Sequence, residues 1–256
     1  MNWRDGSGRA LADYRRPSVA VDVALLTVRA DGLLAVLVHE RDEEYATGRW
    51  SLPGVFVGEQ ELLADAALRA LRDKVGVTGE KPRQLVVLDD PGRDDRGRVL
   101  SVAHVDLVPV ARLPATAHLA PIRGERAVLP GGHTALAFDH DEIVARAVDW
   151  ARDLYRERPD PRGLIGTEFT LRDLQRVHES VLGEPLQKDT FRRRMLGALQ
   201  ETDRLSSGTV GKPARLFRRV GPPPVGSVQP ADGRKATSGS CSDVRRSQPT
   251  TSGTEV

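Results

Sequence analysis

The first half of the chain mixes strand-like and helix-like patterns of hydrophobic residues. A nearly continuous apolar run covers 17–28, and a second covers 33–39 after an Asp-Gly pair. Two such runs joined by Asp-Gly are typical of a β-hairpin. Over 63–76 the apolar residues recur instead at helical spacing, and this segment ends on a glycine suited to a helix C-terminal cap. Another helical pattern covers about 141–156. This mixture predicts an α/β domain.

A break separates this region from a second compact unit. The segment 158–163 contains two prolines and a glycine, and proline disfavours continuation of a helix. We therefore predict a first domain over 17–157 and a second over 158–220. Residues 1–16 are expected to form a flexible N-terminus. The segment 221–256 is rich in Pro, Gly, Ser and Thr with few large apolar residues, so it is predicted to be a disordered tail.

The second unit has the pattern of a winged helix-turn-helix domain. Thr170 and Asp173 form a helix-start signal related to the capping box. A turn with Gly and Pro precedes a second helix, predicted over 187–200. The expected buried stripe of that helix consists of Phe191, Met195 and Leu199. Two short strands, over about 203–205 and 212–219, then form the wing.

Composition and charge narrow the functional class. The 256 residues include one cysteine, Cys241, which excludes a disulfide within the chain and fits a reducing cytoplasm. No apolar run approaches the roughly 18 residues of a membrane-spanning helix, so we expect a cytoplasmic protein without a membrane partner. Residues 1–160 carry a net charge of −4, whereas 161–220 carry +5. This asymmetry favours a nucleic-acid surface on the second domain.

The second helix of the winged unit presents basic residues just after a tight turn. This is the position of a recognition helix in a DNA major groove, where arginine reads guanine and other cations neutralise phosphates. The predicted DNA-binding residues are Lys188, Thr190, Arg192, Arg193 and Arg194 on the helix, with Lys212 and Arg215 on the wing. A small helical dimerisation domain with a solvated basic face is the alternative interpretation.

The segment 54–77 resembles a Nudix box whose metal-binding chemistry has changed. The residues that preserve the frame of the box are Glu61, Arg69, Leu71, Gly76 and Val77. The alignment places Val55 at the family's glycine. The three helix glutamates of the family become Ala70, Asp73 and Lys74. Those positions share one helix face, where convergent carboxylates would bind Mg²⁺. We therefore predict no catalytic residue, no metal site and no cofactor.

Sequence around the box strengthens the resemblance. The WSLPG segment at 50–54 leads into the box as it does in Nudix proteins, and 91–103 resembles a PGRDxRGxVxSVA segment of an ADP-ribose-type Nudix subfamily. The resemblance implies a Nudix-like α/β/α sandwich with a mixed sheet. A C-terminal winged helix-turn-helix domain and the disordered tail would follow it.

Together the two domains resemble the NrtR family, the Nudix-related transcriptional regulators of NAD metabolism. The resemblance covers about 17–220, and in the second domain it is carried by 169–175, 185–193 and 211–217. It implies a homodimeric repressor of genes for NAD synthesis or salvage, bound to a near-palindromic double-stranded operator. It also implies that the Nudix-like domain senses ADP-ribose or a related NAD-derived metabolite, which weakens the hold on DNA.

The charge reversal at Lys74 suggests how a metal-free site would bind such a ligand. Its ammonium stands where the family's glutamates hold a metal, so it would pair directly with the ligand's pyrophosphate. Arg93 and Arg96 are predicted as further phosphate partners, and Glu61 and Asp73 complete the predicted ligand site. The alternative is that Lys74 pairs with one of those two carboxylates or points to solvent.

Two other functions stay open on the sequence alone. A working Nudix hydrolase of ADP-ribose or another nucleoside diphosphate derivative would hold its metal with Glu59, Glu61 and Asp73, although a neighbouring cation opposes metal binding. A non-DNA adaptor built on an inactive Nudix domain would lack DNA affinity that falls steeply with salt. The histidines His104, His133 and His140 lack metal-ligand spacing and are assigned no role.

Overall fold

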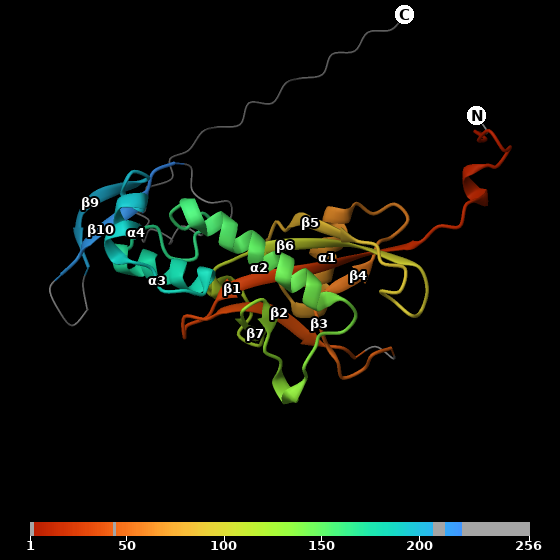
Figure 1. Cartoon of the computed structure of the whole chain (residues 1–256), viewed down its shortest axis with the longest axis horizontal. Helices are drawn as coiled ribbons and strands as arrows, with labels where there is room; N and C mark the ends of the chain where they lie inside the picture. Colours follow the sequence, from red (N-terminus) through yellow and green to blue (C-terminus); the bar gives the residue numbers. More distant parts are fainter. Residues whose placement is uncertain (1–2, 43–44, 207–212, 222–256) are drawn as a thin grey trace, which may run out of the picture.

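The structure is a computed structural model that describes residues 3–42, 45–206 and 213–221. A curled sheet with a helix on each face forms the first domain, and a smaller unit with a two-stranded wing lies at one end of it (Figure 1). The helices are α1 (Leu63–Val75), α2 (His140–Glu157), α3 (Leu171–Leu182) and α4 (Lys188–Leu196), with short 3₁₀ helices at Leu11–Asp13, Val110–Arg112 and Pro130–Gly132. The strands are β1 (Ser18–Val28), β2 (Leu34–Glu40), β3 (Trp50–Ser51), β4 (Gly54–Phe56), β5 (Arg83–Leu88), β6 (Val99–Leu107), β7 (His118–Arg123), β8 (Arg126–Ala127), β9 (Leu199–Leu205) and β10 (Arg215–Arg219).

The large sheet is mixed, as predicted. Its strand order is β5-β6-β1-β2-β7-β8, while β3 pairs with β2 and β4 pairs with β1. The central pair β1 and β6 is parallel, and the other pairings are antiparallel. On β1, Val21 and Val23 belong to the core beneath α1, whereas Ala24 and Leu26 belong to the core beneath α2. Burial on both faces explains the continuous apolar run of this strand.

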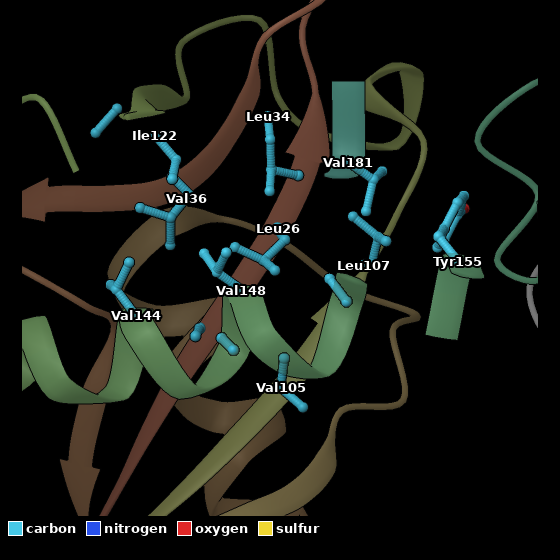
Figure 2. Close-up of a cluster of buried hydrophobic side chains, with 14 of the residues drawn as sticks. Leu26, Leu34, Val36, Val105, Leu107, Ile122, Val144, Val148, Tyr155 and Val181 are labelled. Carbon is cyan, nitrogen blue, oxygen red and sulfur yellow. The ribbon is translucent and has the colours of Figure 1, made fainter. Parts of the chain in front are cut away.

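The two helices of the first domain bury opposite faces of the sheet. Helix α1 buries an alanine-rich stripe and ends at Gly76, whose φ of 67° is the left-handed conformation expected of a C-terminal cap. On the other face, Figure 2 shows Val144 and Val148 of α2 pointing toward Leu26 and Val36. None of the helices in the described residues is long and apolar enough to cross a membrane.

The winged unit follows the predicted order with one correction. Helix α3 has the predicted capping box, in which the Asp173 amide donates to Thr170 Oγ1 at 3.1 Å. The prediction of a second helix through residue 200 was wrong, because α4 ends at Leu196. Leu199 instead begins β9, where it pairs with Arg219 of β10. The backbone hydrogen bonds of the wing replace those of another helical turn. Lys212 and the segment 222–256 lie outside the described residues.

The segment between the two domains is a hydrogen-bonded junction. Asp160 is fully buried, and its carboxylate accepts hydrogen bonds from the Tyr155 hydroxyl at 2.6 Å and from the amides of Leu164 and Ile165 at 2.8 and 3.1 Å. The same carboxylate forms an ion pair with Arg219. Because Tyr155 lies on α2 and Arg219 lies on β10, one side chain ties the connecting helix to the wing.

His178 of α3 completes this junction. Its Nε2 accepts the Asp160 amide proton at 3.2 Å, so the ring proton sits on Nδ1, which is buried without a hydrogen-bond partner. Burial lowers the pKa of His178 to about 4, and the ring is therefore neutral at pH 7. It packs at 5.1 Å against the rings of both Tyr155 and Phe191. This stack connects α2 to α4 through α3.

Apolar packing also crosses the domain boundary. Val181 of α3 belongs to the same buried cluster as Leu34 and Leu107 of the sheet (Figure 2). Beside this cluster, Arg162 forms an ion pair with Asp106 of β6. The two domains therefore share a continuous core that contains residues of the sheet, α2 and α3.

Candidate functional site

A pocket of about 410 Å³ opens beside the box-like segment, between β1, β4, α1 and the loops that precede β6 and α2. Its charged lining residues are the cations Arg41, Arg69, Lys74, Arg93 and Arg96 and the carboxylates Asp22 and Asp94. Apolar and aromatic groups, including Leu52, Phe56 and Phe138, cover other parts of the wall. The excess of cations favours an anionic ligand that also has an apolar or planar part.

The box keeps its shape through an internal ion pair. Arg69 donates to both carboxylate oxygens of Glu61, at 2.7 and 2.8 Å, and Glu61 also accepts the Gly58 amide at 2.9 Å. The hydrogen bonds from Arg69 lower the pKa of Glu61 to about 2. Asp73 is exposed and forms an ion pair with Arg72 at 2.8 Å. The structure therefore brings Lys74 into the pocket but engages the predicted partners Glu61 and Asp73 elsewhere.

Arg93 connects the pocket to the start of α2. Its guanidinium donates to both oxygens of Asp139, at 2.6 and 2.8 Å, and lies 3.8 Å from Asp22. The side chain is only 4% exposed. Asp139 is the residue just before α2. Arg93 thus lines the pocket, as predicted for a ligand contact, while it already holds the N-terminal end of the connecting helix.

Arg96 forms the mouth of the pocket. It makes two hydrogen bonds to the Asp94 carboxylate, at 2.9 and 2.7 Å, and these hydrogen bonds lower the pKa of Asp94. Its guanidinium lies over the rings of Tyr45, Phe56 and Phe138, with 4.6, 5.6 and 5.2 Å to the ring centroids. About a third of the side chain is exposed. This arrangement presents a charged planar group framed by aromatic rings.

Asp22 and His140 are among the pocket residues that the sequence analysis missed. Asp22 lies in the middle of β1, where Ser101 Oγ donates to it at 2.5 Å and His140 Nε2 lies 3.4 Å away. Burial by itself would raise the pKa of Asp22, but His140, Ser101 and Arg93 together lower it. His140 Nδ1 accepts the Leu52 amide at 3.0 Å. A carboxylate inside an apolar strand was the available signal for Asp22; nothing in the sequence pattern indicated His140.

The residues of the box do not fit the divalent metal that the Nudix fold implies. Ala70 offers no donor atom, Asp73 is paired with Arg72, and Lys74 brings a positive charge to the third position. Within the described residues, no group of three or more His, Cys, Asp or Glu side chains could hold a metal ion. The charges that line this pocket favour an anion over a divalent cation.

The predicted DNA-binding residues fall into two groups. Lys188, Thr190, Arg192 and Arg193 are exposed on α4. Arg194 is also exposed, and it donates to the carbonyl oxygen of Arg156 at 3.2 Å. On the wing, Arg215 forms an ion pair with Glu201 at 2.5 Å. The structure therefore presents most of the recognition helix to solvent and gives Arg194 and Arg215 internal partners.

The fold and the two sites define a Nudix-type domain joined to a winged-helix DNA-binding domain. The NUDIX domain model matches residues 16–156, and the model of the NrtR DNA-binding winged helix domain matches residues 161–219. The chain belongs to the NrtR family of Nudix-related regulators.

The chain is also similar to three individual proteins. It is 32% identical over 217 residues to the "ADPR responsive transcriptional repressor NtrR" of Acinetobacter baylyi, covering 81% of this chain and 84% of that protein. The crystal structure of Shewanella oneidensis NrtR complexed with a 27mer DNA is similar with a TM-score of 0.65 and 29% identity, covering 78% of this chain and 93% of that one. The ADP-ribose pyrophosphatase of Methanocaldococcus jannaschii is 29% identical over 54% of this chain and 76% of its own length.

Proposed function

We propose that this protein is a DNA-binding transcriptional repressor that senses ADP-ribose, or a closely related NAD-derived metabolite, through a Nudix domain that does not hydrolyse it. The observation that carries the proposal is the replacement of the box carboxylates by a cationic pocket in a chain that also has a winged helix. The relatives from Acinetobacter and Shewanella support it, because one is a repressor responsive to ADP-ribose and the other was crystallised with DNA. Genes of NAD synthesis or salvage are the expected targets.

The chemistry of the pocket suits a pyrophosphate. Lys74 supplies a point charge at the position of a family glutamate, and Arg96 supplies a fork of donors at the mouth. Arg93 serves a second purpose in this proposal. A phosphate that accepts hydrogen bonds from Arg93 competes with Asp139, and this competition loosens the N-terminal end of α2.

Helix α2 gives a direct path to the DNA-binding unit. Its first residue, His140, lines the pocket, and its C-terminal end contacts Asp160 and Arg194. A ligand releases DNA only if it prefers a dimer state whose recognition helices fit the operator badly. A tenfold loss of DNA affinity needs about 1.4 kcal/mol of such coupling.

The proposal is tested by fluorescence anisotropy in Mg²⁺-free buffer. The labelled duplex comes from the upstream region of the protein's own gene, and a scrambled duplex is the control. We expect tight, salt-sensitive binding to the first duplex, reversed by ADP-ribose, and much weaker non-specific binding to the scrambled duplex. Specific binding that ADP-ribose leaves unchanged would remove the effector from the proposal. Absence of specific binding to the operator duplex would overturn the proposed repressor function.

Replacing Lys74 by glutamine should weaken ADP-ribose binding by about 10- to 100-fold, because a hydrogen bond to a charged group contributes about 1.5–3 kcal/mol. Isothermal titration calorimetry in EDTA measures the change. The matched control is Arg72→Gln, which removes one positive charge from the exposed ion pair with Asp73. Equal affinity in Lys74→Gln and wild type, or a requirement for Mg²⁺, would contradict the assigned role.

An active hydrolase is the second candidate function, favoured by the similarity to the Methanocaldococcus pyrophosphatase. Incubation of ADP-ribose with the protein and Mg²⁺, followed by chromatography for AMP, separates the two functions. We expect no turnover, because the helix face that should carry three carboxylates carries Ala70, an ion-paired Asp73 and Lys74.

A further inference from the structure

The cations of the winged unit differ in whether they have partners within the protein. Arg194, Arg204, Arg215, Arg218 and Arg219 each hydrogen-bond or ion-pair with a carbonyl oxygen, an amide oxygen or a carboxylate of the chain. Within the described residues of the unit's helices and wing, the cations without such a partner are Arg172, Arg176, Lys188, Arg192 and Arg193. An unpaired cation has its full hydrogen-bonding capacity available for an external anion.

Four of these five cations line one groove between α3 and α4. Arg172 and Arg176 stand four residues apart on α3, and Lys188 and Arg192 stand four residues apart on α4. The groove has a volume of about 490 Å³. Like charges at this spacing destabilise each helix, so the arrangement is unfavourable until an anion lies between the two rows.

One carboxylate lines the same groove without neutralising it. Glu179 Oε1 accepts hydrogen bonds from Gln175 Nε2 and from the Leu186 amide, both at 2.9 Å. These bonds hold Glu179 against the turn that joins α3 to α4. The groove therefore keeps an excess of positive charge and an ordered shape.

We propose that this groove binds the phosphodiester backbone of one operator strand, so that Arg172 and Arg176 of the first helix carry phosphate contacts beside those of α4. Neither arginine was among the DNA-binding residues predicted from the sequence. The assignment rests on DNA binding by the winged unit and specifies where the backbone lies. Arg194 and Arg215 differ from these cations in having a hydrogen-bond or ion-pair partner within the chain.

Phosphate contacts leave a thermodynamic signature that base contacts do not. Each neutralised phosphate makes the slope of log K against log salt concentration more negative by about 0.9 on duplex DNA. Because a dimer loses two contacts with each substitution, Arg172→Gln and Arg176→Gln are each expected to reduce the magnitude of that slope by about 1.8. Affinity at 0.1 M salt should fall by roughly 30- to 100-fold for each, and equally on operator and scrambled duplexes.

The experiment compares anisotropy titrations at several salt concentrations. Arg146→Gln, which removes an arginine paired with Glu142 at 3.3 Å on α2, controls for loss of charge far from the groove. Arg172→Lys and Arg176→Lys keep the charge, and we expect them to keep the wild-type slope. Unchanged slopes in both glutamine variants, with wild type still bound to the operator, would overturn the groove assignment alone. Failure of wild type to bind the operator would overturn the assignment and the proposed function together.

Discussion

Replacing Asp160 by asparagine should destabilise the winged unit by about 3–5 kcal/mol, the usual cost of removing one partner of a buried ion pair. The buried carboxylate accepts hydrogen bonds from Tyr155, Leu164 and Ile165 and pairs with Arg219. Asparagine tolerates the positive φ of 41° at this position, so the variant removes the charge without straining the backbone. Its amide group also turns one acceptor oxygen into a donor that faces other donors.

Calorimetry and hydrogen exchange measure this effect. We expect a new transition at lower temperature, and faster amide exchange in β9 and β10 than in β1 and β6. Asp153→Asn is the matched control, because Asp153 forms an exposed ion pair with Arg156 at 3.5 Å; such pairs contribute about 0–1 kcal/mol. Equal melting curves for the two variants would show that Asp160 is not the residue that ties the wing to α2.

Replacing Gly54 by alanine should abolish the effector response while leaving the winged unit folded. Gly54 pairs with Asp22 across β4 and β1. An added Cβ would overlap Asp22 Oδ1 and lie 3.2 Å from the Val21 carbonyl oxygen. Asp22 cannot turn away without losing Ser101, and overpacking of this kind costs about 1–3 kcal/mol. Because Asp22 lies beside Arg93 and His140, the displacement distorts the pocket itself.

Calorimetric titration with ADP-ribose should show an affinity at least about tenfold lower for Gly54→Ala, a loss of roughly 1.4 kcal/mol or more. Gly58→Ala, in the segment that follows β4, is the control, since its Cβ would meet Glu61 at an ordinary distance of 3.4 Å. The double variant with Asp22→Ala tests the cause. Removal of the carboxylate relieves the overlap, so the two changes should destabilise the protein less than additively. Strict additivity would mean that the clash is not with Asp22.

Much of this architecture follows from local sequence signals. The apolar run of β1, the Asp-Gly turn, the Gly76 cap and the Thr170 capping box each act within a few residues, and the structure confirms them. The replacement of two box carboxylates by Ala70 and Lys74 at fixed spacing is likewise visible in the sequence itself.

Contacts between segments that are distant in the sequence could not be predicted from such local signals. Asp160 stands between two prolines in a stretch that reads as a linker, yet its partners come from α2 and β10. Arg194 is predicted as a DNA contact, and the tertiary structure adds a hydrogen bond from Arg194 to the Arg156 carbonyl oxygen that the sequence did not indicate. The end of α4 was missed because pairing of β9 with β10 overrides the helical spacing of Leu199.

The length of α2 determines how far a small rotation at its pocket end displaces its other end. A helix of 18 residues is about 27 Å long. Turning it by about 5° around its pocket end would move its far end by roughly 2 Å. In a two-fold dimer the separation of the recognition helices would change by roughly 5 Å, more than the rise of about 3.4 Å per base pair. With such a rotation, release of the Arg93–Asp139 ion pair in the proposed dimer would become a spacing error of about one and a half base pairs between operator half-sites.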